Sequence, residues 1–545
     1  MRNRIYPQIV PKGELAARGL KNFARLHDRW YRPGIAGYPG AESPGWPGDW
    51  EGRSILALTL LSSKYRLVPA YLDELVMDVL SRRNEFGYRG ELMRPGAINE
   101  QSLSGHSWLL RGLCEYYMAY GKKEAYEAIA RIIENLFLPL RGKWKSYPID
   151  KKEREHFADG KAAGELTGQI VNGWLLSSDT GCAFMSLDGL AQSYELLRIP
   201  ELAALIGEMI ARYIEIDYVA MTMQTHAALT ASRGMLRMAE IFDGDKYCEH
   251  VKKVFQIYQK KGMTENYANY NWFGDPKWTE PCGIVDSYMI AMQLWEKTGD
   301  EHYLQQAQLI WHNGVERGQR PNGGFGCDNS VTEGMLHADQ NFYEAYWCCT
   351  MRGAEGLSCR AENGAYLEEE TLVVPYLSSG MIRFEQKALA LCETTDYPIG
   401  GNAEFLVEEY HGPPISMKIY SPSWASDIRL ALNGDPIGFS REGSFTRFSA
   451  KLKAGDRFRL SFAIPLRISQ TVTDLHAEKG LHRILHGDLV LGTEETKAEN
   501  PDISSFAYLG NGAYEWEGAR FAPINMAYLC DEQKLKSMDL RILFR

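Results

Sequence analysis

Three cysteines and one glutamate, in two short segments, have the residue types of a metal site. Cys348 and Cys349 are adjacent, and Glu280 and Cys282 stand two residues apart in Glu280-Pro281-Cys282. Three thiolates and a carboxylate suit a tetrahedral zinc ion. We expect Glu280 and Cys282 to reach such an ion from a loop that enters a helix. The cysteine pair would reach it from the opposite side.

The alternative for any cysteine is a buried thiol that packs as a small apolar group. A cysteine pair is weak evidence for a metal by itself, and the spacing here is not that of a zinc finger. Cys327, in the segment 326–328, is a spare candidate ligand for which packing is favoured. Packing is also expected for the remaining cysteines, which are Cys114, Cys182, Cys248, Cys359, Cys392 and Cys530.

Amphipathic helices that alternate with short breaks fill the segment 14–364. A helix, a turn of glycine and charged residues and a second helix follow each other around Gly121 and again around Gly299. About six such pairs predict a closed (α/α)6 toroid, with an open solenoid as the alternative. In the toroid the inner helices would begin near residues 52, 105, 185, 225, 282 and 345. Their first turns would open onto one mouth, where the metal-site candidates would converge.

The hydrophobic period changes to two beyond residue 365. Ile415, Met417 and Ile419 alternate with polar residues, and a similar run ends in the Asn433-Gly434 turn. We expect a β-sandwich over 365–470 and a second small β-unit over 471–545, which residues 1–13 could join. The predicted fold class is therefore multidomain α and β, with an (α/α)6 toroid followed by antiparallel β-sandwich domains.

The composition is that of a globular protein, with 45% hydrophobic and 24% charged residues among 545. A formal net charge of −10 argues against a nucleic acid as partner, because phosphate binding needs a basic surface. We recognise neither a signal peptide nor a membrane-spanning run, so a cytoplasmic location without membrane contact is expected. Ten cysteines in so long a chain predict reduced thiols rather than a disulfide framework.

The order and spacing of these motifs resemble the β-L-arabinofuranosidase family, glycoside hydrolase family 127 (GH127), and its close relatives. That family carries an (α/α)6 barrel followed by β-sandwich domains. It holds zinc through a Glu-Thr-Cys motif and both cysteines of a Cys-Cys-Pro-Pro-Asn motif, which Glu280-Pro281-Cys282 and Cys348-Cys349 match in part. The resemblance implies a Zn²⁺ ion held by Glu280, Cys282, Cys348 and Cys349, with the Cys348 thiolate as nucleophile.

The same resemblance implies further site residues. The catalytic glutamate of the family matches Glu265, which would act as general acid and then as general base. Two helix starts of the family match His106 and His226, which would hydrogen-bond sugar hydroxyls. The chain departs from the family pattern because no Pro-Pro-Asn follows Cys349. The segment 184–188 also reads Phe-Met-Ser-Leu-Asp where another histidine is expected.

Three residues have two interpretations each. Tyr267 and Trp272 lie close to Glu265 in the sequence and could form a wall that stacks on a sugar ring, or could anchor the loop. Asp179 precedes a predicted helix and could reach the pocket from its loop, although a helix cap is the simpler interpretation.

The predicted function is a retaining exo-glycosidase that releases a terminal L-arabinofuranose or similar sugar from an oligosaccharide or glycoside. One alternative is another (α/α)6 sugar hydrolase or lyase without catalytic zinc. The other is a non-catalytic carbohydrate-binding protein. Metal content would separate the first alternative from the predicted function, and turnover would separate the second. The oligomeric state is left open.

Overall fold

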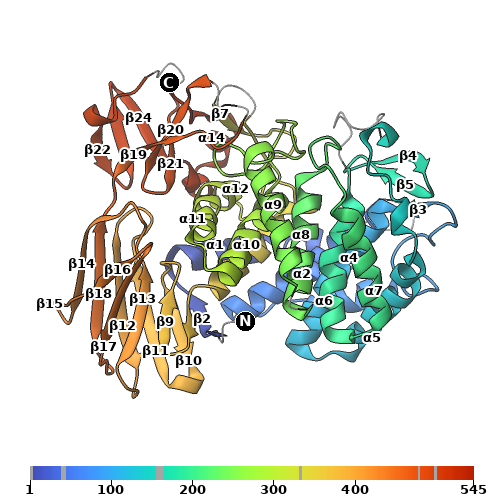
Figure 1. Ribbon diagram of the computed structural model, residues 1–545, viewed down its shortest axis with the longest axis horizontal. Helices are drawn as coiled ribbons and strands as arrows, with labels where there is room; N and C mark the ends of the chain where they lie inside the picture. The colour runs from blue at the N-terminus through green and yellow to red at the C-terminus, as the bar shows by residue number, and fades with distance from the viewer. Residues whose placement is uncertain are drawn as a thin grey trace.

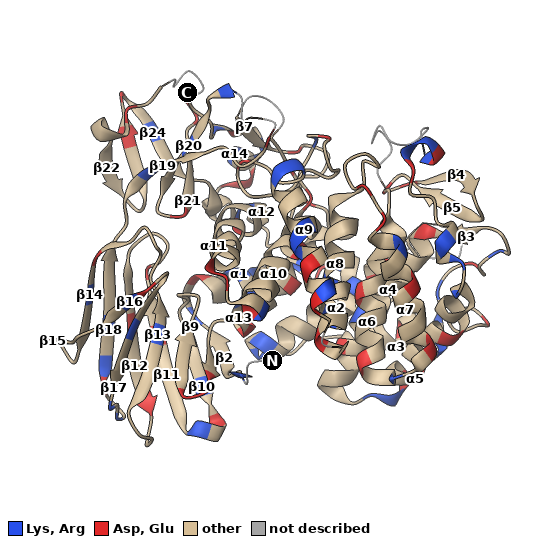
Figure 2. Cartoon of the chain, in the orientation of Figure 1, with Lys and Arg blue, Asp and Glu red and all other residues tan. Residues whose placement is uncertain are grey.

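The computed structural model describes residues 4–37, 45–154, 164–242, 244–330, 334–474, 476, 479–495 and 500–545. Helices dominate the chain up to about residue 362, and strands dominate the rest, which forms two β-regions beside the helical barrel (Figure 1). Acidic and basic positions are interspersed over both parts (Figure 2). Within the described ranges, no helix combines the length and apolar character that a membrane span requires.

Six helices of the described chain form a closed inner ring. Each packs on the next in chain order, and the last packs back on the first, so the ring is closed. The predicted (α/α)6 toroid is therefore confirmed, and the open solenoid is wrong. The inner helices are α2 (Asp49–Tyr65), α4 (Glu100–Tyr120), α6 (Ser186–Leu197), α8 (Thr225–Phe242), α10 (Pro281–Thr298) and α13 (Cys349–Glu362).

The outer helices are amphipathic, and each follows or precedes an inner helix in the chain. In α5 the buried residues Ala125, Ala128, Ile129 and Ile132 recur with the spacing of one helix face, which packs on the inner ring. The outer helices are α1 (Gly13–Arg25), α3 (Leu72–Ser81), α5 (Lys123–Ile132), α7 (Pro200–Tyr213), α9 (Asp245–Lys261) and α11 (Glu301–Ile310).

Glycines let the inner helices approach each other closely. A Cβ atom at Gly52 of α2 would lie 2.3 Å from the backbone nitrogen of Leu109 in α4. A Cβ atom at Gly189 of α6 would lie 2.6 Å from the carbonyl oxygen of Ser107. Any larger residue at either position would force the helices apart, so these glycines set the width of the ring.

Two sheets form the β-sandwich that follows the barrel. Phe448 of one sheet and Phe458 of the other are 5.6 Å apart between ring centroids, so the sheets face each other across an aromatic core. The first sheet has the order β1 (Arg4–Ile5), β8 (Tyr366–Glu368), β9 (Thr371–Val374), β13 (Ile415–Tyr420), β17 (Phe445–Ala450) and β16 (Ser440–Glu442). The second has the order β15 (Asp435–Pro436), β14 (Ser426–Leu432), β18 (Arg457–Ala463), β12 (Asn402–Glu409), β11 (Leu389–Thr395), β10 (Gly380–Phe384) and β2 (Gln8–Pro11).

The alternation expected from the sequence is present in this sandwich. Ile415, Met417 and Ile419 are all buried on β13, and Met417 pairs with Phe448 of β17. Strand pairing in the two sheets is antiparallel, apart from the parallel pair β9–β13. The predicted run before Asn433-Gly434 is β14, and its turn leads into β15.

A third sheet makes up most of the C-terminal β-unit. Its strands are β19 (Leu466–Gln470), β20 (His482–His486), β21 (Leu489–Gly492), β24 (Ala519–Pro523), β23 (Ala513–Trp516) and β22 (Ala507–Gly510). The last strand, β25 (Asp539–Arg541), instead pairs with β7 (Met335–Ala338), which lies in the loop before α13.

The N-terminal strands differ from the expectation. Arg4 of β1 pairs with Glu368 of β8, and Val10 of β2 pairs with Met381 of β10. The first residues therefore extend both sheets of the sandwich and do not join the C-terminal unit. That unit also takes β19, so its first strand starts at Leu466, a few residues before the expected 471.

Candidate metal centre and active site

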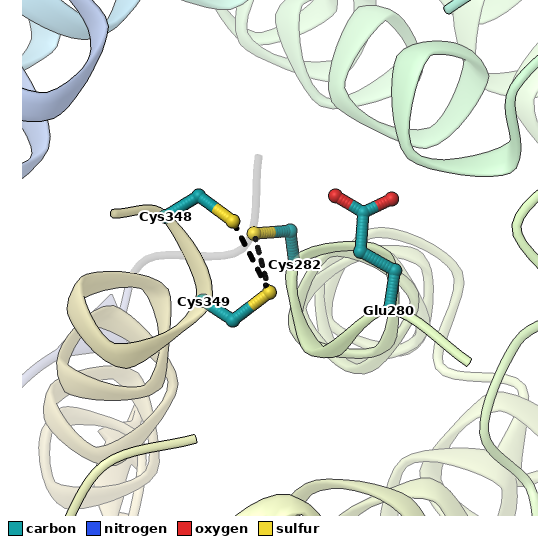
Figure 3. Close-up of side chains that lie close together, drawn as sticks. All are labelled: Glu280, Cys282, Cys348 and Cys349. Atoms are coloured by element: carbon teal, nitrogen blue, oxygen red, sulfur yellow. Dashed lines mark hydrogen bonds between the residues drawn. The ribbon is translucent and has the colours of Figure 1, made fainter. Parts of the chain in front are cut away.

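The four predicted metal ligands come together at the first turns of two inner helices. One ligand atom from each of Glu280, Cys282, Cys348 and Cys349 lies within 4.8 Å of those of the others. The Sγ atom of Cys349 is 3.5 Å from that of Cys282 and 3.4 Å from that of Cys348. Figure 3 shows the three sulfur atoms pointing toward one another, with the Glu280 carboxylate beside them.

Helix starts position these ligands. Glu280 occupies the N-cap position of α10 without a capping hydrogen bond from its side chain, Pro281 occupies the first helical position, and Cys282 follows in the first turn. Cys348 occupies the N-cap position of α13, whose first helical residue is Cys349. The positive ends of two helix dipoles thus meet at groups that carry negative charge when ionised.

The chemistry of the donor set fits a metal ion that prefers thiolates. Burial raises the pKa of the Cys282 and Cys349 thiols well above the ordinary value, so these sulfurs would stay protonated without a nearby cation. The guanidinium of Arg53 supplies one positive charge, with Nη1 3.5 Å from the Cys282 sulfur. A bound cation would supply the rest of the compensation.

A cavity of about 280 Å³ adjoins the cluster at the mouth of the barrel. Cys348 is half-buried and lines it, whereas Cys282 and Cys349 are buried. Aromatic rings form much of the wall, and polar side chains are set between them. The aromatic lining residues are Trp46, Trp50, Trp278, Phe342 and Trp347. The lining carboxylates, amides and basic groups among the described residues are Asp49, Arg53, Asp179, Gln224, His226, Asn271 and Glu280.

His226 connects the metal cluster to the core of the barrel. Its Nδ1 atom lies 3.2 Å from Oε1 of Glu280, and its Nε2 atom lies 3.4 Å from Oδ2 of Asp286. Arg233 donates to Asp286 at 2.9 Å, and Arg352 contacts the same carboxylate. His226 therefore lines the cavity as predicted, but its ring nitrogens face carboxylates. In this structure it orients Glu280.

Asp179 and Asp49 are the other carboxylates of the cavity wall in the described chain. Asp49 is held by Arg53 in a two-point ion pair of 2.7 and 3.0 Å. Asp179 accepts a hydrogen bond from the backbone N–H of Gly164 at 3.2 Å. Burial, with a smaller contribution from Glu280, raises the pKa of Asp179 to about 7.

Glu265 is not among the residues that line the cavity. Its buried carboxylate accepts hydrogen bonds from the backbone N–H groups of Val472 (2.8 Å) and Thr473 (3.2 Å), and it lies 3.2 Å from Nδ1 of His476. Arg483 donates to its backbone carbonyl at 3.1 Å. Glu265 therefore ties the barrel to the C-terminal β-unit, which corrects the prediction that it is the acid/base.

His106 is also placed in the core. Its Nε2 atom accepts a hydrogen bond from the backbone N–H of Arg89 at 2.9 Å, and its Nδ1 atom bonds to the carbonyl of Ser102 at 2.6 Å. Burial lowers the pKa of His106 to about 4, so the ring is neutral. Both nitrogens are used inside the fold, which corrects its predicted contact with sugar hydroxyls.

The aromatic residues that line the cavity are not the two that were predicted to do so. Tyr267 is buried against Arg483, whose guanidinium lies 4.7 Å from its ring centroid, and it does not line the cavity. Trp272 is buried and packs edge-on against Trp278 at 5.0 Å. Trp278 is the ring that lines the cavity, so Trp272 supports the wall from behind.

Several lining residues were missed in the sequence, although a signal for some was available. Asp49, Trp50 and Arg53 are among the first five residues of an inner helix, close to its start as the cysteines are, and Trp347 lies two residues before another. Treating residues of every type near the start of an inner helix as candidates to line the cavity would have found them. Asn271 lies in the loop before α10, where no local pattern distinguishes lining from packing residues.

Residues 371–464 match the family model of the β-L-arabinofuranosidase GH127 middle domain. No match is found among curated proteins. A GH127 β-arabinofuranosidase structure superposes with a TM-score of 0.72 at 13% identity, covering 99% of this chain and 97% of that one. A GH127 β-L-arabinofuranosidase from Geobacillus stearothermophilus T6 gives 0.69 at 12% identity, covering 98% and 99%. The resemblance to the β-L-arabinofuranosidase family is thus confirmed, by sequence in the middle domain and by fold over nearly the whole chain.

Proposed function

We propose that the chain is a glycoside hydrolase of the β-L-arabinofuranosidase type, a retaining exo-enzyme that releases a terminal L-arabinofuranose or a similar sugar. The observation that carries this proposal is the half-buried Cys348 thiol, which belongs to the candidate metal cluster and lines an aromatic-walled cavity. Aromatic faces suit the apolar faces of sugar rings. A volume of about 280 Å³ suits one terminal sugar better than a run of polymer.

The proposed metal is Zn²⁺, held by Glu280, Cys282, Cys348 and Cys349. When bound, the ion would keep these thiols deprotonated at neutral pH, and this supplies a nucleophile without a neighbouring base. Arg53 adds a positive charge beside Cys282, and His226 holds Glu280 in orientation.

The proposed reaction has two displacement steps at the anomeric carbon. The Cys348 sulfur attacks this carbon, a C–S bond forms, the bond to the leaving oxygen breaks, and that oxygen takes a proton from a general acid. Water then attacks the same carbon and gives its proton to the conjugate base of that acid, and the C–S bond breaks. Two inversions give net retention.

Two amides support sugar recognition in this cavity. The side-chain oxygens of Gln224 and Asn271 are buried and have no hydrogen-bond partner among the described residues. A buried acceptor without a partner is costly, and a rotation of either amide that turns its oxygen into the cavity would let a sugar hydroxyl satisfy it. A ligand lacking the matching hydroxyls would leave them unpaired, which is a source of specificity.

The test is turnover of a panel of nitrophenyl glycosides that includes the β-L-arabinofuranoside, with zinc content measured on the same sample. We expect release of nitrophenol from the arabinofuranoside and about one zinc per chain. Binding of the sugar without turnover would favour the non-catalytic alternative. Turnover of a different glycoside by a zinc-free sample would favour the other (α/α)6 hydrolases.

Two variants distinguish the loss of the proposed nucleophile from a general effect of losing a thiol. Cys348→Ser should abolish turnover, because an alcohol in this position is far less ionised than a metal-bound thiolate. Cys114→Ser is the control, since Cys114 is a buried thiol that contacts Ser193 within the barrel and lies outside the cavity lining. Equal turnover by the two variants would contradict the role of Cys348.

A further inference from the structure

Because Glu265 does not line the cavity, the proposed reaction lacks a proton donor. Three carboxylates line the cavity among the described residues. Asp49 is engaged in an ion pair with Arg53. Glu280 belongs to the metal cluster and faces His226. Asp179 lacks an ion-pair partner within the described part of the chain, so its carboxyl group is the one of the three available for proton transfer.

The order of helices in the ring places Asp179 across the cavity from the nucleophile. Asp179 lies in the turn before Cys182–Met185 and α6, and the backbone N–H of Gln224 at the start of α8 donates to the carbonyl of Thr180. In the closed ring α6 is the third helix from α13, which begins beside Cys348. Groups on facing sides of the cavity can flank a scissile bond, as retaining hydrolysis requires.

On the basis of the proposed function, we infer that Asp179 is the general acid and base of this enzyme. In the first step its carboxyl proton passes to the leaving oxygen as the C–S bond to Cys348 forms and the C–O bond breaks. In the second step its carboxylate takes a proton from water as the water oxygen bonds to the anomeric carbon and the C–S bond breaks. Protons and electron pairs balance, and Asp179 ends protonated.

The surroundings of Asp179 allow both protonation states near neutral pH. Its pKa of about 7 comes mainly from burial, with Glu280 and Asp49 adding negative charge nearby. The other charged or titratable groups of the cavity wall are Arg53, His226 and the cysteine thiols. A group that must give a proton and then take one works best when its pKa lies close to the working pH.

The experiment compares Asp179→Asn with the wild-type protein on two arabinofuranosides, one with nitrophenol and one with a simple alcohol as leaving group. Nitrophenolate leaves without protonation, whereas an alkoxide does not. We expect kcat/KM to fall on the order of 10²–10⁴-fold for the alkyl glycoside and far less for the nitrophenyl glycoside. Azide should raise turnover of the nitrophenyl substrate by Asp179→Asn and form the arabinosyl azide, because it attacks without general-base help.

Glu265→Gln is the matched control, since it also removes a buried carboxylate charge but lies outside the cavity lining. It should keep the wild-type ratio of the two substrates and give no azide product. Zinc content should be equal in all three proteins. If Asp179→Asn fails to fold, Asp179→Ser is measured with the same two substrates and azide.

The outcomes separate this inference from the proposed function. A wild-type protein that cleaves no glycoside of the panel would overturn the proposed function, and the role of Asp179 with it. An active wild-type protein whose Asp179→Asn variant keeps the wild-type ratio of substrates and ignores azide would overturn the role of Asp179 alone. Loss of turnover on both substrates to the same degree, without azide rescue, would also overturn it, since that pattern indicates a structural role.

Discussion

Nδ1 of His226 lies 3.2 Å from Oε1 of Glu280, so a barrel histidine holds the only carboxylate of the metal cluster in the described chain. The opposite ring nitrogen faces Asp286, and the ring stacks on Trp108 at 5.8 Å between centroids. One ring nitrogen thus faces the Glu280 carboxylate, the other faces Asp286 without a hydrogen bond, and one face of the ring is covered by Trp108. Partners of this kind set the orientation of a ligand and the affinity of a site.

We therefore predict that His226→Ala lowers metal affinity by about 10- to 100-fold, which is the range seen when such a partner is lost. Competition with a coloured chelator measures this change. His250→Ala is the control, because His250 bonds to Tyr218 at 2.8 Å and lies outside the cavity lining. Equal zinc affinity in the two variants would contradict the orienting role of His226.

The helical ring was predictable because its signals are local. Gly121 and Gly299, which marked two hairpin turns in the sequence, end α4 and α10 in the left-handed conformation, with φ of 65° and 72°. Where β1 and β2 pair was not predictable, since a strand of two to four residues carries no information about which sheet edge it joins. That choice depends on partners such as Glu368 and Met381, more than 350 residues away.

Glu265→Gln tests the anchoring role. Its carboxylate accepts two backbone hydrogen bonds and faces His476, and a neutral amide would weaken all three interactions. Because bonds to a charged acceptor contribute about 1.5–3 kcal/mol each, we expect a loss of a few kcal/mol in the free energy of unfolding. Chemical denaturation measures the loss, and the zinc content should not change.

Gln470→Glu is the companion change for this prediction, because it alters a residue near the same segment without touching the Glu265 contacts. A Glu265→Gln protein as stable as that companion would show that the carboxylate does not anchor the C-terminal unit.

The convergence of the four candidate metal ligands was predictable and the position of Glu265 was not, for the same physical reason. Glu280, Cys282, Cys348 and Cys349 sit at helix starts, and the ring brings every inner helix start to one mouth. Glu265 lies in the irregular loop between α9 and α10, one part of which faces the cavity while another faces the C-terminal unit. The sequence of that loop does not reveal which residues face which side.

Asp286→Ala tests the buried ion pairs that adjoin the candidate metal site. Asp286 is fully buried and contacts Arg233 and Arg352, so its loss would leave both guanidinium groups without this partner. Removing one member of a buried ion pair costs about 3–5 kcal/mol in the free energy of unfolding. Glu442→Ala is the control, because its ion pairs with Lys418 and Arg447 lie at the surface and should each be worth less than about 1 kcal/mol. Urea unfolding of the two variants should differ accordingly.

The raised pKa of Asp179 makes a prediction for stability that is separate from turnover. The pKa is about 7 in the folded chain, against about 3.9 for an unperturbed aspartate. Below pH 4 the group is protonated in both states and has no effect. Between pH 4 and 7 the unfolded chain releases the proton and the folded chain keeps it, so stability falls as pH rises. Above pH 7 the folded chain is ionised as well, and the full reduction in the free energy of unfolding is present.

Asp179→Asn removes this reduction, so it should be more stable than the wild-type protein at pH 8, by up to a few kcal/mol, and nearly equal to it at pH 4. Unfolding by urea at both values measures the difference. Asp73→Asn should show the opposite sign, because hydrogen bonds from Tyr116 and Lys122 lower the pKa of Asp73. If Asp179 serves proton transfer, Asp179→Asn should gain stability and lose alkyl-glycoside cleavage. Removal of a purely structural carboxylate would lower both.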